Sequence, residues 1–188
     1  MPSHEKRTVF VTVGTTQFDH LVTTVLSDEA LALLAEQGYH RLCIQYGRGT
    51  PPPAVPASAP LEVESYRFKD SLAEDMQGAA LLVSHAGAGS IMEGLRCRAA
   101  LVVVVNDQLM HNHQQELAHE LDTRGHLVAT TPAGLVAALR ALPERASKLT
   151  PFPESDPDIF PAFLEAQLGL VDAKPDHEPS VAPACAIL

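Results

Sequence analysis

The sequence predicts an α/β protein with a Rossmann-like parallel sheet and helices on both faces. Three observations support this fold class. Short β-branched or apolar runs recur along the chain, as in residues 8–13. Segments with apolar side chains at helical spacing separate these runs. The run Leu101–Val105 is apolar at every position, which is typical of a strand covered on both faces.

The first half of the chain follows this alternation. Gly14 ends the first strand, Ser27 is placed to cap the second helix, and Gly38 is placed to stop it. Residues 51–60 contain too many prolines for a regular element and are expected to form a stiff surface loop. The expected strands are 8–13, 42–45 and 61–66, and the expected helices are 18–26, 28–37 and 70–77.

The second half continues the pattern and then changes in composition. Pro132 is expected to open the last helix of the sheet domain at its first turn. The other expected elements are strands 80–83, 101–105 and 126–129 and helices 89–97 and 108–123. Prolines become frequent after Thr150. We therefore expect a main domain over residues 1–150, a peripheral C-terminal helix over 151–170 and a flexible tail over 171–188.

Composition excludes several classes of function. The formal net charge of −10 disfavours nucleic acid and anionic lipid as direct partners, since both attract clustered Lys and Arg. Three scattered cysteines do not make a disulfide framework. The polar start predicts no signal peptide, and no apolar run reaches the length of a membrane span. We expect a cytoplasmic protein.

The segment His85–Ser90 is the most informative part of the chain. Small residues follow the fourth expected strand and precede a helix. Small residues let a ligand approach the backbone, and a helix start attracts anions. Glu93 follows one turn later, where a carboxylate is able to hold a ribose diol. The segment therefore predicts a diphosphate cradle, although such a turn also serves tight packing alone, and Glu93 also suits a solvated surface.

Three segments are expected at the carboxyl edge of the sheet, where ligands of such folds bind. They are Gly14–Thr16, His85–Glu93 and Asn106–Gln115. Amides, hydroxyls and a carboxylate together suit a sugar nucleotide. A nicotinamide dinucleotide fits less well, because Met92 occupies the position of the third glycine in that fingerprint.

These motifs carry a resemblance to a known family. They are Phe10–Thr16, Ser84–Ser90, Val105–Asp107 with Asn112–Gln115, and Lys148–Pro153. Over about residues 8–168 the chain resembles the catalytic subunits of the UDP-N-acetylglucosamine (UDP-GlcNAc) transferase of asparagine-linked glycosylation. That family is similar to the donor-binding C-terminal half of the bacterial peptidoglycan N-acetylglucosaminyltransferase, a GT-B enzyme of glycosyltransferase family 28.

The resemblance implies a split, inverting glycosyltransferase. This chain would bind UDP-GlcNAc, and a membrane-anchored subunit would bind the acceptor, dolichyl-diphosphate-GlcNAc, on the cytosolic face of the endoplasmic reticulum. Only the heterodimer of the two subunits would be active, and the reaction would need no cofactor. His85 and Glu93 would be the catalytic candidates, and Phe68 would lie near the uracil. The residues implied in UDP-GlcNAc binding are Gly14, Thr15, His85, Gly87, Ala88, Gly89, Ser90, Glu93, Asn106, Gln114 and Gln115.

Other signals point to alternatives. His111, His113, His119 and His126 lack the spacing of a metal site, so no metal is expected. The final residues, Cys185–Leu188, match a prenylation box, without the polybasic segment that usually accompanies one. The competing functions are a non-catalytic sugar-nucleotide sensor and another nucleotide-diphosphate-binding α/β enzyme.

Overall fold

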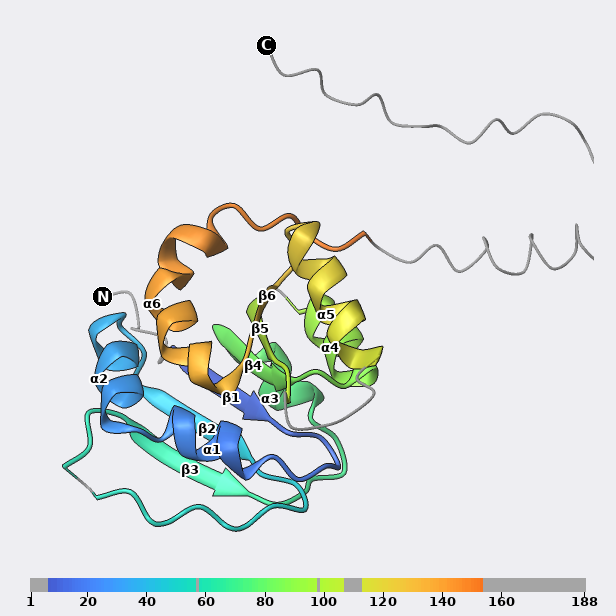
Figure 1. Cartoon of the computed structure of the whole chain (residues 1–188). Coiled ribbons are helices and arrows are strands. Elements are labelled where there is room, and N and C mark those ends of the chain that lie inside the picture. The colour runs from blue at the N-terminus through green and yellow to red at the C-terminus, as the bar shows by residue number, and fades with distance from the viewer. Residues whose placement is uncertain (1–6, 57, 98, 107–112, 154–188) are drawn as a thin grey trace, which may run out of the picture. The chain divides into compact units, whose positions relative to one another are not determined.

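The computed structural model describes residues 7–153 except 57, 98 and 107–112 (Figure 1). Contacts divide the chain into a compact unit, Met1–Phe152, and a second unit, Pro153–Leu188. Within the described residues, the first unit contains one sheet of six parallel strands in the order β3-β2-β1-β4-β5-β6. The strands are β1 (Thr8–Thr12), β2 (Arg41–Gln45), β3 (Glu62–Tyr66), β4 (Leu81–His85), β5 (Ala100–Val104) and β6 (Val128–Thr130).

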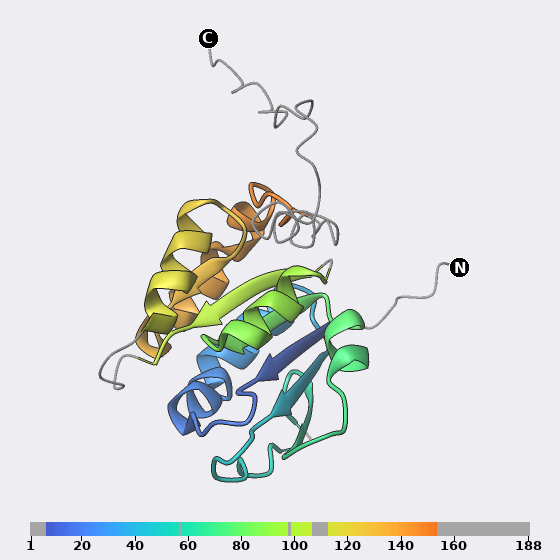
Figure 2. The ribbon, with the colours of Figure 1, turned by 90° about the vertical axis from the view of Figure 1, so that its right-hand side faces the viewer.

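Helices connect the strands and cover both faces of the sheet. They are α1 (Asp19–Val25), α2 (Asp28–Glu36), α3 (Ala73–Gln77), α4 (Ala88–Leu95), α5 (His113–Thr123), the 3₁₀ helix η1 (Pro132–Gly134) and α6 (Leu135–Ala146). Helices α1, α2 and α6 lie on one face, and α3, α4 and α5 lie on the other (Figures 1 and 2). The predicted fold class is confirmed.

The central strand β1 supplies both cores. Its side chains alternate between the two faces, so Val9 and Val11 pack with α1, α2 and α6, while Phe10 packs with α3, α4 and α5. All three side chains are fully buried. A strand covered by helices on both faces buries side chains on both sides, which explains the continuous apolar runs in the sequence.

Several expected boundaries were right and others were wrong. Ser27 caps α2, since its hydroxyl accepts a hydrogen bond from the Ala30 amide, and Gly38 takes a φ of +81° beyond the helix end. The fourth strand was expected over 80–83 but ends at His85, because the buried sheet continues through two polar residues. The helix expected over 70–77 begins only at Ala73, and the turn at Pro132 is 3₁₀.

The strand order reverses between β1 and β4. Chain connections lead outwards from β1 through β2 to β3, and from β4 through β5 to β6. The connection that follows β1 leads to one face of the sheet and the connection that follows β4 leads to the other. This divergence leaves a crevice at the carboxyl ends of β1 and β4. Gly14 and Gly87 follow closely on those ends, so the fold places two of the predicted site segments together.

Candidate functional site

Buried polar side chains gather at the carboxyl edge of the sheet. Among the described residues, the buried polar side chains are Thr12, Gln45, Ser84 and His85, with exposed fractions of 1%, 1%, 1% and 9%. Each occupies one of the last two positions of β1, β2 or β4. Burying a polar group costs free energy unless it gains partners. This edge is therefore chemically distinct from the apolar interior beneath it.

The ring of His85 lies between two glycines. A Cβ at Gly14 would lie 2.6 Å from His85 Cε1, and a Cβ at Gly87 would lie 2.3 Å from His85 Nε2. Gly14 also has a φ of +61°, a conformation that disfavours residues with a side chain. Glycine at both positions makes room for the imidazole. The loop after β1 and the loop after β4 thus contact each other through His85.

Burial controls the protonation of His85. Its Nδ1 is buried without a hydrogen-bond partner in the described part of the chain. Burial lowers the pKa of the imidazole below its ordinary value, and the Thr12 backbone offsets this only in part. The ring is therefore neutral at pH 7 in the unliganded protein.

The amino end of α4 is open to an anion. Gly87 is the N-cap residue and no side chain caps the first turn. The first turn also contains no acidic residue, so nothing on it opposes a negative ligand. Ala88 and Gly89 are exposed, and a Cβ at Gly89 would have no atom within 4 Å among the described residues. The first amides of a helix have no partner within the helix, so they face outwards.

A hollow of about 510 Å³ lies between α4 and the segment that leads into α3. Glu93 of α4 lines it together with Arg96 and Cys97, which follow the helix, while residues 69–73 line it from the other side. Phe68, beside this segment, exposes 49% of its surface. Glu93 is exposed and borders the hollow one turn from the start of α4. The hollow therefore lies towards the carboxyl end of α4, and Glu93 stands between it and the first amides of the helix.

The third predicted segment is only partly visible. Asn106 is half-buried directly after β5, and Gln115 is exposed in the first turn of α5. Thr15 is exposed beside Gly14. The side chain of Gln114, residues 107–112, the helix and tail expected after residue 153, and Cys185 lie outside the described residues. The part of the chain that is described holds no group of side chains suited to a metal ion.

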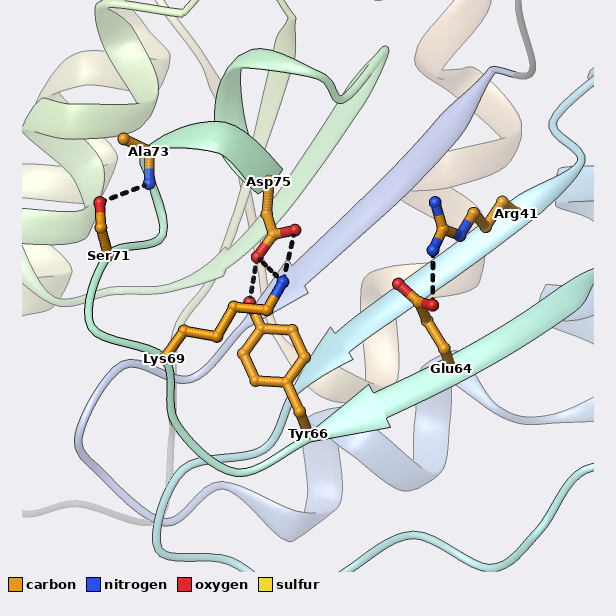
Figure 3. Close-up of polar contacts among 7 residues, drawn as sticks. All are labelled: Arg41, Glu64, Tyr66, Lys69, Ser71, Ala73 and Asp75. Carbon is orange, nitrogen blue, oxygen red and sulfur yellow. Dashed lines mark hydrogen bonds and ion pairs between the residues drawn. The ribbon is translucent and has the colours of Figure 1, made fainter.

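Two polar features were missed in the sequence. One is Gln45, whose amide links the loops after β1 and β3. The other lies on β2, β3 and α3, where Arg41 pairs with Glu64 at 2.5 Å and Asp75 accepts hydrogen bonds from Tyr66 and Lys69 (Figure 3). In the sequence, polar residues at the end of an apolar run were the only signal of these contacts. The sequence does not show which residues, distant along the chain, are their partners.

No helix in the described ranges has the length and apolarity needed to cross a membrane.

Comparison with known proteins adds a family to this geometry. The family model of the glycosyltransferase family 28 C-terminal domain matches residues 8–159. The UDP-N-acetylglucosamine transferase subunit ALG13 of Yarrowia lipolytica is 36% identical over 148 residues, covering 76% of each chain. The ALG13 subunit of Mus musculus is 50% identical over 122 residues, which are 65% of this chain. Those residues span only 10% of the mouse protein.

Solved structures agree. An NMR structure of ALG13 superposes with a TM-score of 0.61 at 32% identity, covering 86% of this chain and 94% of that one. MurG from Acinetobacter baumannii has a TM-score of 0.57 at 17% identity and shows the shared fold, with 77% of this chain covered and 42% of MurG. The resemblance in the motifs is thereby confirmed: the chain belongs to the glycosyltransferase family 28 C-terminal domain family, in the group that includes the ALG13 subunits of UDP-N-acetylglucosamine transferase.

Proposed function

We propose that this chain is the donor-binding, catalytic subunit of a UDP-GlcNAc transferase in asparagine-linked glycosylation. The observation that carries the proposal is the uncapped amino end of α4, exposed beside His85 at the reversal point of a family 28 fold. The relatives are named as transferase subunits, which supports a role in a larger enzyme. The acceptor in this proposal is dolichyl-diphosphate-GlcNAc, presented by a membrane-anchored subunit at the cytosolic face of the endoplasmic reticulum.

The donor would lie along α4. Its diphosphate would accept hydrogen bonds from the amides of Ala88, Gly89 and Ser90. Glu93 follows Gly89 by four residues, about 6 Å along a helix axis, so its carboxylate would meet the ribose diol. The uracil would enter the hollow beside Phe68, since that hollow opens next to Glu93.

The sugar would extend towards the loops after β1 and β5. Gly14 and Thr15 would border the acceptor side of the crevice. Asn106, Gln114 and Gln115 would supply amides that both donate to and accept from the hexose hydroxyls.

The reaction would be a single displacement. A hydroxyl oxygen of the acceptor GlcNAc forms a bond to the anomeric carbon as the bond from that carbon to the UDP oxygen breaks, which inverts the centre, and the hydroxyl proton passes to a base or to water. Negative charge grows on the departing diphosphate. Fixed amides and the positive end of α4, aimed at that charge, stabilise the transition state more than the ground state.

His85 would assist as a neutral donor. Its Nε2 lies beside Gly87 and the cradle, so a proton on Nε2 would be placed to donate to the diphosphate. An approaching diphosphate would raise the pKa of the ring and strengthen this hydrogen bond.

Substitution of Glu93 tests the donor site. Glu93→Gln removes the charge from the proposed ribose contact and should weaken UDP-GlcNAc binding by about 1–3 kcal/mol in calorimetry. Glu36→Gln on α2 is the matched control, because Glu36 is exposed on the opposite face and should leave the affinity unchanged. Equal affinity of Glu93→Gln and wild type would remove Glu93 from the site. Absence of binding by the wild type would overturn the donor role.

Transfer assays test the division of labour. The chain alone should bind donor but transfer little or no GlcNAc to a short dolichyl-diphosphate-GlcNAc analogue, and co-expression with the membrane partner should restore transfer. Robust transfer by the chain alone would contradict partner dependence. Donor binding without transfer in the complex would instead favour a sugar-nucleotide sensor.

A further inference from the structure

Gln45 occupies an unusual position for an amide side chain. It is the last residue of β2, between β1 and β3, and exposes only 1% of its surface. The backbone pairing of the three strands ends just beyond it, where the Val13 amide donates to the Gln45 carbonyl and the Tyr46 amide donates to the Tyr66 carbonyl. The loops that follow β1 and β3 begin at this level.

The Gln45 amide continues the pairing where the backbone stops. Its Nε2 donates to the Gly14 carbonyl at 2.8 Å and to the Arg67 carbonyl at 2.8 Å. Its Oε1 accepts from the Thr12 hydroxyl at 2.6 Å. Two carbonyl acceptors require the NH₂ group on that side, so the orientation of the amide is set by its partners.

The two carbonyls belong to loops with different roles in the proposed donor site. Gly14 packs against the ring of His85, at the diphosphate and acceptor side. Arg67 leads directly into Phe68 and Lys69, at the mouth of the hollow. A single buried side chain therefore joins the loop after β1 to the loop after β3.

We infer that Gln45 is a positioning residue for the nucleotide sugar. It sets the separation between the loop after β1 and the loop after β3, so that the diphosphate and the nucleoside meet their sites together. This inference rests on the proposed function, because it assumes that one ligand spans both loops.

The test compares Gln45→Met with Gln37→Met in the full chain. Methionine keeps the length of glutamine but removes its hydrogen bonds. Gln37 is a matched control, since its Nε2 also donates to a backbone carbonyl, that of Leu139, at 2.8 Å. Gln37 is the C-cap residue of α2 and Leu139 lies on α6, and both helices are on the face opposite to α4.

Gln45→Met should weaken UDP binding by tenfold or more in calorimetry at a temperature where both variants are fully folded. Uridine lacks the diphosphate and would contact one loop only, so its affinity for Gln45→Met should be close to its affinity for the wild type. A purely structural role predicts a lower melting temperature for both variants and an unchanged UDP affinity for both, and that result would overturn the inference. Failure of the wild type to bind UDP would instead defeat the proposed function.

A measurement on the wild type keeps the inference testable if Gln45→Met does not fold. The side-chain NH₂ protons of Gln45 should exchange slowly with water and should shift when UDP binds, together with the amides of residues 14–16 and 67–69. Rapid exchange, or shifts in only one of the two loops, would contradict it.

Discussion

Gly87 and Gly89 are two residues apart in a small-residue segment, Gly87 as the N-cap of α4 and Gly89 in its first turn. The structure gives them different surroundings. A Cβ at Gly87 would lie 2.3 Å from the Nε2 atom of the buried His85, whereas a Cβ at Gly89 would meet no described atom within 4 Å. The first glycine makes room for the protein's own imidazole, and the second leaves space at the start of α4.

This difference predicts opposite effects of alanine. Gly87→Ala should lower the free energy of unfolding by about 1–3 kcal/mol, because the His85 ring must leave its position in a packed site. Gly89→Ala should leave stability unchanged or raise it by about 0.5–1 kcal/mol, since alanine is the better helix former. Urea unfolding of both variants checks this. Equal destabilisation would mean that the ring is not held where the structure places it.

The connection from β3 to α3 depends on a charged hydrogen-bond cluster. The Lys69 ammonium donates to both carboxylate oxygens of Asp75, at 2.9 and 2.8 Å, and the Tyr66 hydroxyl donates to the same group (Figure 3). Burial raises the pKa of Asp75, but the hydrogen bonds from Lys69 and Tyr66 outweigh it, so the net pKa is lowered from 3.8. Burial and the neighbouring Asp75 raise the pKa of Tyr66.

The sign of the shift predicts acid lability. A carboxyl group with a lowered pKa stabilises the fold above its unfolded value of about 3.8 and loses that contribution as the pH falls through the folded value. Asp75→Asn should therefore lower the free energy of unfolding by about 1 kcal/mol at pH 7, and by progressively less as the pH falls below 4. Urea titrations from pH 7 to pH 3 measure this. Glu144→Gln, in an exposed helical pair with Lys148, should have almost no effect at any pH. A difference between Asp75→Asn and wild type that does not change with pH would contradict the proposed role of the charge.

Sequence patterns gave the strands and helices but not the polar contacts between them. The all-apolar run at 101–105 indicates a strand covered on both faces without any tertiary information. Ser84 and His85 resemble a loop in the sequence because their burial depends on β1 and β5, the strands that flank β4 in the sheet. Gln45 resembles an ordinary strand end for the same reason, since its acceptors are 31 and 22 residues away. Such contacts depend on strand order, which periodicity does not encode.

At the scale of the whole molecule, the folded unit extends slightly beyond its expected end at residue 150. The Thr150 amide donates to the Gly125 carbonyl at 2.8 Å, and the Thr150 carbonyl lies 2.9 Å from His126 Nδ1. The Phe152 ring packs edge-on against His126, with centroids 5.2 Å apart, and joins the core under α5. These contacts tie the end of α6 back to the turn before β6.

Two shortened chains test where the folding unit ends. A chain that stops after Pro153 keeps these contacts and should retain the unfolding free energy of the full chain and its affinity for UDP-GlcNAc. A chain that stops after Leu149 loses two hydrogen bonds and an aromatic contact, and should be less stable by about 1–3 kcal/mol. Urea unfolding and donor calorimetry of both chains measure this. Equal stability would place the boundary before Thr150, whereas a loss of stability already in the longer chain would show that residues after 153 contribute to the same folding unit.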